Sequence, residues 1–409
     1  MTENRKQKKL TVGNWQLAIG KIKLALAYCL LHTIICSSFA YALGTPPPKC
    51  KPNYIRVAIV QDAFELTLSI KGRYKIVRPH TNEILIKGNS LRKARVLPAA
   101  SGIKVNKYLF KIYAIKIKPE RKAAIFLNRY RLRGDLELIR QKNRTLLAVN
   151  EVDIEDYLRG VLREEVSPHW PMEALKAQAV AARTFALYQD CLNKDKDYGL
   201  DRTVYSQLYG GVRQETWRTN RAVRETAGEV LTYKGKIFPA FFHATCGGHT
   251  EDASELWNID IPPLKGVNCP FCKRSPHYSW RVKIPLSQIK ESLNKKGYKI
   301  SRISHISAIG RSKSGRVKKV KISGDKEIRV EANEFRLIVG ADLIRSTNFK
   351  IALKNKNLLV QGLGWGHGVG LCQWGAYFMA RRGFDYRQIL EYYYPGAKLT
   401  QFHSNTGLQ

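Results

Sequence analysis

The chain has 409 residues and carries 70 Lys and Arg residues against 33 Asp and Glu residues, a formal net charge of +37. This length excludes a minimal module, because it is enough for two or three domains with hydrophobic cores of their own. The charge favours an anionic polymer as partner: a nucleic acid, an anionic membrane or an anionic cell-wall polymer. A basic surface that is simply solvated is the alternative.

Residues 1–42 have the layout of an export signal. Basic residues precede an apolar run over residues 24–39, and Ala40-Tyr41-Ala42 then offers a small-x-small cleavage site. This pattern predicts a signal peptide, with an uncleaved membrane anchor as the alternative. Export to the periplasm or cell envelope argues against nucleic acid and in favour of envelope polymers.

Residues 53–150 consist of short β-rich runs separated by turns, which predicts an antiparallel β region behind the Pro-rich linker at 44–52. Residues 51–150 hold 23 Lys and Arg residues against six Asp and Glu residues, so the positive charge is concentrated here. Helical and strand patterns alternate after this region. The fold class expected is α+β: a β-rich N-terminal region followed by a mixed α+β domain.

A helix is predicted from Ile154, and it places a carboxylate on its apolar face. Apolar side chains recur with helical spacing, and the next position on the same face, i+11, is Glu165. A carboxyl on a buried face is costly when ionised, so its pKa should rise, as a general acid requires. Alternatively, the helix frays before Glu165, because Pro168 disfavours helix at Ser167. A second, alanine-rich helix is expected from Pro171 to about Leu192.

Four side chains further on have the spacing of a zinc site. His243 and Cys246 form His-x2-Cys, and Cys269 and Cys272 form Cys-x2-Cys. The sequence therefore predicts a structural Zn²⁺ site with these ligands, for which His249 and His277 are substitutes. In an exported protein a disulfide from Cys246 to Cys269 or Cys272 is a rival interpretation, and free thiols are a third.

Glycine occupies every second position from 362 to 370 in VQGLGWGHGVGLCQWGA. If this stretch is extended, one face has no side chains, and a ligand or another chain segment can approach the backbone closely. Trp365 and Trp374 offer indole faces suited to a sugar ring, and His367 is expected to form hydrogen bonds rather than to catalyse. Tight backbone packing alone is the alternative. Two helices, at about 371–382 and 385–394, are expected to follow.

Several other classes of function find little support. The glycine run is not G-x-G-x-x-G, no G-x-S-x-G occurs, and aromatic residues are not grouped as in nucleic-acid modules. A cysteine nucleophile at Cys246 or Cys372 has no partner that the spacing identifies.

From about Arg133 to Leu399 the chain resembles the SpoIID/LytB family, named for stage II sporulation protein D and the amidase enhancer. The matching elements appear in order: RGDLELI, AVNEVDIEDYLRGV, EEVSPHWPMEALKAQAVAARTFAL, TVYSQLYGG, FFHATCGGHTEDASELW, SPHYSW, GRSKSGRVKKV, GLGWGHGVGLCQWGAYFMARRG and YYYPGAKL. With this resemblance the chain divides into residues 1–42, a basic β-rich region at 43–132 and a catalytic region at 133–400.

The resemblance implies a peptidoglycan lytic transglycosylase that cleaves between N-acetylmuramic acid and N-acetylglucosamine, prefers strands without stem peptides, and leaves 1,6-anhydro ends. Aligning Gly160 with the family's motif places the catalytic acid at Glu165, although Arg163 and Glu164 stand where proline and serine are usual. Residues expected to hold the sugar are Gln207, Tyr209, Thr245, Trp365, His367 and Gln373. No cofactor is required for this chemistry, and an amidase is the expected functional partner.

Two alternatives stay open on the sequence. The chain can be a non-catalytic peptidoglycan-binding activator of an N-acetylmuramoyl-L-alanine amidase, or a zinc hydrolase. A zinc site with four protein ligands has no open position, so zinc is expected to affect stability rather than rate.

Overall fold

The computed structural model describes residues 53–203 and 206–402 of the chain. The predicted signal or anchor segment, residues 1–42, lies outside them. The fold is α+β with a β-rich N-terminal region, as predicted. Within the described residues, no helix combines the length and the apolarity that crossing a membrane requires.

An 11-stranded sheet forms the first part of the structure, and it is antiparallel except where β1 meets β11. The strand order is β11-β1-β10-β9-β6-β2-β3-β4-β5, and β7 pairs with β2 and β8. The strands are β1 (Tyr54–Ala63), β2 (Leu66–Val77), β3 (Ile84–Ala99), β4 (Gly102–Val105), β5 (Tyr108–Phe110), β6 (Ala114–Pro119), β7 (Ala124–Leu127), β8 (Tyr130–Leu132), β9 (Asp135–Arg140), β10 (Leu146–Asp153) and β11 (Leu200–Asp201).

Alternate side chains of these strands are buried, and together they form the first hydrophobic core. In β2, for example, Leu66, Leu68 and Ile70 are buried while the residues between them are more exposed, the period expected of a strand with one covered face. The sheet continues through β9 and β10 past residue 132, so its last strands belong to the region predicted as catalytic. The proposed boundary at 132/133 stays a prediction.

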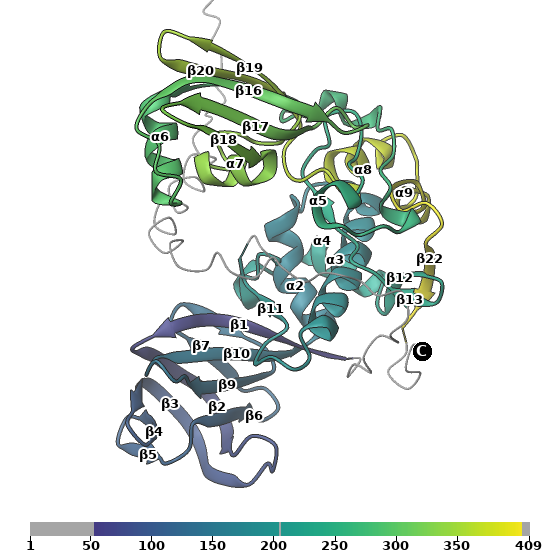
Figure 1. Ribbon diagram of the computed structural model, residues 1–409. Helices are drawn as coiled ribbons and strands as arrows, with labels where there is room; N and C mark the ends of the chain where they lie inside the picture. The colour runs from purple at the N-terminus through teal and green to yellow at the C-terminus, as the bar shows by residue number, and fades with distance from the viewer. Residues whose placement is uncertain (1–52, 204–205, 403–409) are drawn as a thin grey trace, which may run out of the picture. The chain divides into compact units, whose positions relative to one another are not determined.

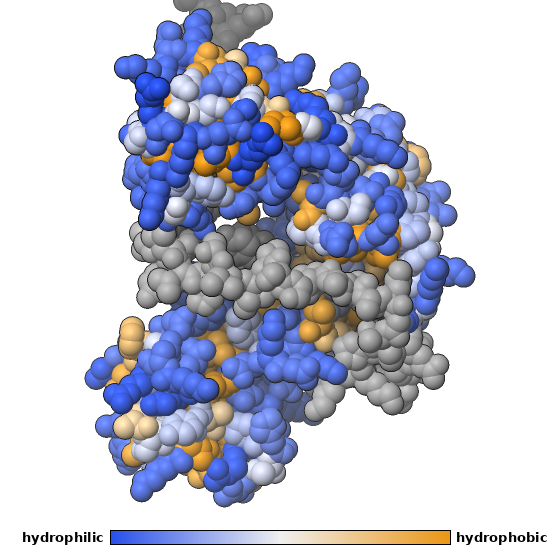
Figure 2. Space-filling view, in the orientation of Figure 1, coloured by the Kyte–Doolittle hydropathy of each residue, from blue (hydrophilic) through white to orange (hydrophobic). Residues whose placement is uncertain are grey.

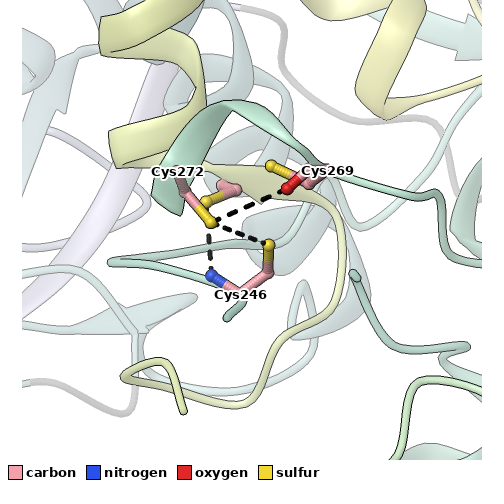
Figure 3. Close-up of side chains that lie close together, drawn as sticks. Cys246, Cys269 and Cys272 are labelled. Atoms are coloured by element: carbon pink, nitrogen blue, oxygen red, sulfur yellow. Dashed lines mark hydrogen bonds between the residues drawn. The ribbon is translucent and has the colours of Figure 1, made fainter. Parts of the chain in front are cut away.

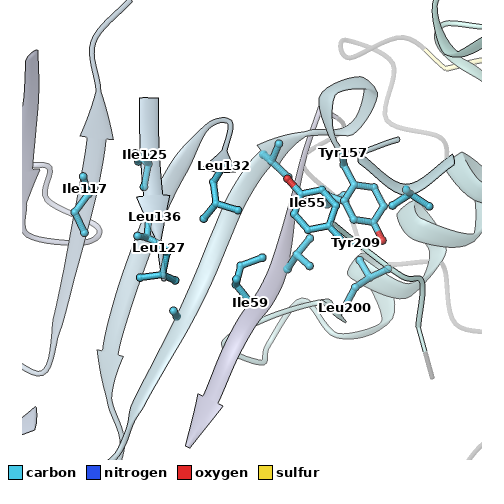
Figure 4. Packing of buried hydrophobic residues seen from close by; sticks show 14 of the residues in the cluster. Ile55, Ile59, Ile117, Ile125, Leu127, Leu132, Leu136, Tyr157, Leu200 and Tyr209 are labelled. Atoms are coloured by element: carbon cyan, nitrogen blue, oxygen red, sulfur yellow. The ribbon is translucent and has the colours of Figure 1, made fainter. Parts of the chain in front are cut away.

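Helices α2 (Ile154–Glu165) and α3 (Met172–Leu192) contact this sheet, and α4 (Trp217–Glu225) packs against both of them. Helix α2 begins where β10 ends, because the Asp153 carboxylate accepts from the N–H groups of Glu155 and Asp156. Figure 4 shows Ile55 and Leu200 of the sheet close to the rings of Tyr157 and Tyr209, and all four residues belong to one buried cluster. The site-bearing helix α2 is thus packed directly on the end of the sheet.

A second core lies around the C-terminal helices. Its elements are β12 (Glu229–Tyr233), β13 (Lys236–Ile237), β14 (Phe242–His243), α5 (Ser254–Trp257), β21 (Leu371–Cys372), α8 (Gln373–Ala380), α9 (Tyr386–Tyr393) and β22 (Lys398–Gln401). Strand β14 pairs in parallel with β21, although more than 120 residues separate them in sequence. The two C-terminal helices were predicted, and Asp385 caps α9 in a capping box with Gln388.

Between β14 and β21 the chain forms a third core from two three-stranded sheets, β15-β20-β19 and β16-β17-β18 (Figure 1). Its elements are β15 (Ser279–Pro285), α6 (Leu286–Lys295), β16 (Ile303–Arg311), β17 (Val317–Gly324), β18 (Glu327–Glu331), α7 (Ala332–Val339), β19 (Phe349–Lys354) and β20 (Asn357–Leu363). On the face drawn in Figure 2 the visible surface is mostly hydrophilic, with separate small apolar areas.

The glycine run is not the extended strand that its alternation suggested. Strand β20 ends at Leu363, and Gly364, Gly366, Gly368 and Gly370 all have φ between +71° and +107°. A Cβ on Gly370 would lie 2.0 Å from the Phe241 carbonyl oxygen, and a Cβ on Gly364 would lie 2.6 Å from that of Thr245. These glycines therefore allow chain segments to pack closely, which was the alternative interpretation.

Candidate active site

Glu165 is the last residue of α2 and continues its apolar face. Ile154, Tyr157, Leu158, Val161 and Leu162 are all buried, as the helical spacing predicted. Glu165 itself is half-buried, whereas its neighbour Glu164 is exposed. The helix ends directly after Glu165 because Val166 is extended, and so the predicted carboxylate remains helical.

The surroundings of Glu165 favour its protonated form. The pKa of this carboxyl rises from 4.5 to about 7, mainly because of burial and to a smaller extent because of the negative charge of Glu164. One opposing contact exists, because the backbone N–H of Leu208 donates to Glu165 Oε1 at 3.2 Å and lowers the pKa. A carboxylic acid with a pKa near neutrality can both donate and take up a proton in one reaction.

The segment that supplies the Leu208 N–H is held from both sides. Tyr157 Oη donates to Gln207 Oε1 at 3.0 Å, and Gln207 Nε2 donates to the Ala182 carbonyl at 3.2 Å. Tyr209 Oη donates to Asn150 Oδ1 at 3.1 Å. Gln207 and Tyr209 are 1% and 4% exposed. Their side chains are engaged in the core and position the backbone beside Glu165. Direct contact with substrate stays a prediction for both.

Gly160 explains how this segment approaches α2. A Cβ at this position would lie 2.7 Å from Tyr209 Cε2, and the Gly160 carbonyl accepts from Gly210 N–H at 3.1 Å. The absence of a side chain lets the Tyr209 ring lie against the helix one turn before Glu165. The glycine that aligned the family motif thus has a local packing role.

Two other predicted sugar ligands are buried as well. Thr245 is 1% exposed, and its backbone pairs with that of Trp365 in both directions. Gln373 is 7% exposed and donates from Nε2 to Gln178 Oε1 on α3 at 3.4 Å. Both side chains are buried, and their contact with a sugar stays a prediction.

His367 is half-buried, and both of its ring nitrogens are engaged by the backbone. Nε2 donates to the Phe242 carbonyl at 2.9 Å, and Nδ1 accepts from the Val369 N–H at 3.1 Å. Burial lowers the pKa of this imidazole to about 3. The ring is therefore neutral with its tautomer fixed, and its hydrogen bonds tie the glycine run to β14.

A belt of partly exposed aromatic side chains begins five residues after Glu165. The centre of the Trp170 ring lies 5.0 Å from that of Trp374 and 5.2 Å from that of Tyr377. The centre of the His277 ring lies 4.9 Å from that of Trp365 and 6.2 Å from that of Trp374, so His277 connects the two tryptophans. Arg218 fixes the loop, donating to the carbonyls of Pro168 and Trp170. Of this belt, sequence reasoning singled out Trp365 and Trp374; Trp170 was missed, although it lies within the matched motif.

The predicted metal ligands are brought together with one exchange. Cys246, Cys269 and Cys272 lie close to one another (Figure 3), and the fourth thiol of the group is Cys372. His243 donates from Nδ1 to the Val369 carbonyl at 3.0 Å and is not part of this group. The structure thus places Cys372, and not His243, beside the three predicted cysteines, and Cys372 comes from a distant segment that no local spacing reveals.

Comparisons with known proteins identify relatives of the segment that contains the candidate site. Residues 142–233, which contain Glu165 and the segment around Leu208, match the family described as Stage II sporulation protein, and residues 265–370 match a domain of unknown function (DUF8618). An uncharacterized protein of Brachyspira hyodysenteriae is 36% identical over 352 residues, which cover 86% of this chain and 94% of that protein.

Two relatives from Bacillus subtilis carry functional names. The amidase enhancer is 30% identical over 60% of this chain, which covers 40% of that relative. Stage II sporulation protein D is 30% identical over 62% of this chain and 76% of its own length. The chain belongs to the SpoIID family.

Proposed function

We propose that this chain is a peptidoglycan lytic transglycosylase that acts outside the cytoplasmic membrane. The observation that carries the proposal is Glu165: a carboxyl at the end of an apolar helix face, with a pKa of about 7 and one fixed N–H donor. The similarity to stage II sporulation protein D and to the amidase enhancer supports a role in the cell wall.

One carboxylic acid is enough for the proposed reaction. Glu165 donates its proton to the glycosidic oxygen while the bond from that oxygen to C1 of N-acetylmuramic acid breaks. The C6 hydroxyl oxygen of the same sugar bonds to C1, and its proton passes to the Glu165 carboxylate. The products are an N-acetylglucosamine end with a free hydroxyl and a 1,6-anhydro end, and no water is consumed. Attack within one sugar supplies a large proximity advantage.

The aromatic belt gives the glycan a surface to bind. Trp170, Trp374 and Trp365 present indole rings, and Arg345 lies 4.9 Å from the Trp365 ring centre. Sugar rings stack on such faces, while the basic β region attracts anionic wall polymers. We also propose that the chain prefers glycan strands without stem peptides. An amidase that removes those peptides would then be its functional partner.

The test uses the purified chain and two matched variants, Glu165→Gln and Glu164→Gln, with intact and amidase-treated peptidoglycan. Mass spectrometry of released sugars is expected to show 1,6-anhydro ends for the wild type and Glu164→Gln, and none for Glu165→Gln, which still binds the wall. Reducing ends would mean hydrolysis and a second carboxylate. Activity in Glu165→Gln with loss in Glu164→Gln would move the acid by one position.

A second function has an observation in its favour, the relative named amidase enhancer. In this case the chain binds peptidoglycan and stimulates an amidase without cleaving glycan. The same assay separates the two functions: wild type that binds the wall, yields no sugar ends of either kind and accelerates an added amidase would identify the activator.

A further inference from the structure

Four cysteine side chains outside the proposed active site form one compact group. Cys246, Cys269, Cys272 and Cys372 are free thiols with 0% exposure, and their Sγ atoms all lie within 4.8 Å of one another. We propose that they bind one Zn²⁺ as a structural tetrathiolate site. In a tetrahedron with Zn–S bonds of about 2.3 Å, neighbouring sulfurs are about 3.8 Å apart.

The backbone around the group supplies hydrogen bonds suited to charged sulfur. Cys246 N–H donates to Cys372 Sγ at 3.3 Å, Gly375 N–H to the same sulfur at 3.4 Å, and Gly248 N–H to Cys246 Sγ at 3.4 Å. Donors around the ligands orient them and stabilise thiolate charge, as is usual around metal sites. Neutral thiols, which are weak acceptors, gain little from such contacts.

A buried cation lies beside the group. Arg316 is 1% exposed, and its guanidinium donates to the Cys246 carbonyl at 2.7 Å, the His249 carbonyl at 3.0 Å and Ser314 Oγ at 2.9 Å. These hydrogen-bond partners are neutral. The buried carboxylate of Glu251 and the sulfurs of Cys246, Cys272 and Cys372 act on the guanidinium electrostatically, and a buried guanidinium is costly without such negative charge. Zn²⁺ with four thiolates has a net charge of −2, so Arg316 and the metal centre would compensate each other.

Disulfide formation is the main competing interpretation, and the geometry favours metal. A disulfide joins two sulfurs at about 2.05 Å, whereas Cys246 Sγ and Cys272 Sγ are 3.4 Å apart. Two disulfides would divide the group into pairs and leave the N–H donors without thiolates. Metal binding uses all four sulfurs at once and leaves no position open for water, so the site would be structural rather than catalytic.

The position of the group explains what the metal would stabilise. Cys246 follows β14, Cys269 and Cys272 precede β15, and Cys372 ends β21 and caps α8, where its Sγ accepts from Gly375. The metal would thus join the segment after β14 and the segment before β15 to the start of α8. Trp374 in the first turn of α8 is part of the aromatic belt, so metal loss would also loosen that surface.

The experiment measures metal in the full chain, purified without chelator and without a metal-affinity tag. Elemental analysis should give one zinc per chain, and X-ray absorption should give four sulfur neighbours at about 2.3 Å. An organomercurial should release the zinc, and the free energy of unfolding should fall after release. These readouts do not depend on glycan cleavage, so they stand or fall separately from the proposed activity.

Two variants identify the fourth ligand. Cys372→Ser should lose most of the zinc, whereas His243→Gln should retain one per chain. Zinc kept by Cys372→Ser but lost by His243→Gln, or a shell of three sulfurs and one nitrogen, would overturn the tetrathiolate set. Peptide mapping that finds disulfides among these cysteines in metal-free wild type would overturn the metal site itself, even if the variants fail to fold.

Discussion

Leu208 donates its backbone N–H to Glu165 Oε1 at 3.2 Å, across 43 residues of sequence. This contact holds the carboxyl in one orientation while leaving its pKa at about 7. A side-chain cation at the same place would have kept Glu165 ionised, because an adjacent positive charge lowers a carboxyl pKa by one unit or more. A single amide donor fixes the position of the acid and lets it keep its proton.

Stability should depend on pH through Glu165 in a predictable direction. Its pKa is about 7 in the folded chain against 4.5 for an unperturbed carboxyl, so between these values the native state holds a proton that the unfolded state releases. The free energy of unfolding therefore falls as pH rises from about 4.5 to 7, by roughly 3 kcal/mol at most. Glu165→Gln removes this loss, so it should be more stable than wild type at pH 8 and about equal at pH 4.

Urea unfolding of wild type, Glu165→Gln and the exposed control Glu164→Gln at both pH values measures this effect. A stability gain for Glu165→Gln that is the same at pH 4 and pH 8 would contradict the raised pKa. For glycan cleavage, the rate should decline as pH rises through about 7, because Glu165 must carry a proton to act as the acid.

Replacing Gly160 with Ala should reverse the usual effect of this substitution in a helix. Alanine in a helix interior is normally more stable than glycine by about 1 kcal/mol. Here the new Cβ would lie 2.7 Å from the Tyr209 ring, and overpacking of this kind costs roughly 1–3 kcal/mol. Gly160→Ala should lower both the free energy of unfolding and the cleavage rate, since Tyr209 adjoins Leu208. Arg163→Ala, at an exposed position of α2, serves as the control. If Gly160→Ala were more stable than wild type, the Tyr209 ring would have to move away from the new Cβ with little loss of packing energy, which would contradict this prediction.

Local patterns predicted the acid because everything that selects it lies within one helix. The period of 3.6 residues from Ile154 placed Glu165 on the buried face. In the structure, α2 extends from Ile154 to Glu165, as predicted. The two C-terminal helices were predictable for the same reason, with Asp385 as a recognisable cap. The basic β region was predictable from its short β-rich runs and the turns between them.

Features that depend on distant contacts were not predictable. Gly370 has a positive φ, and the Phe241 carbonyl also occupies the space that a side chain would need, a contact across 129 residues. Cys372 is 100 residues beyond Cys272, so a search for short ligand spacings chose His243 instead. Gln207 was expected to hold the sugar, and only the packed structure shows its amide held by Tyr157 and Ala182.

Arg183 should be among the most sensitive positions for stability. Its guanidinium is 0% exposed and forms a bidentate ion pair with Glu155 at 2.8 and 2.7 Å, joining α3 to α2. Removing one partner of a buried pair costs about 3–5 kcal/mol, because the other charge stays buried alone. We expect Arg183→Met to lose stability on this scale and Arg183→Met/Glu155→Gln to recover part of it. Lys295→Met, which breaks an exposed pair with Glu291, should cost less than about 1 kcal/mol. Equal losses in chemical denaturation for the two single variants would refute the role of Arg183.

Trp170 is the aromatic residue of the belt nearest in sequence to Glu165, and it offers the clearest test of glycan binding. Its ring is partly exposed beside Trp374 and Tyr377, so Trp170→Ala should remove a stacking surface without unfolding the core. A loss of about 1 kcal/mol corresponds to roughly fivefold weaker binding.

Binding to amidase-treated peptidoglycan is measured in the Glu165→Gln background, so that turnover does not interfere. Trp170→Phe should keep most of the affinity. Trp217 on α4 is 69% exposed and lies outside the belt, so Trp217→Ala is the matched control. If Trp217→Ala weakens binding as much as Trp170→Ala does, the effect comes from general surface hydrophobicity rather than from this belt.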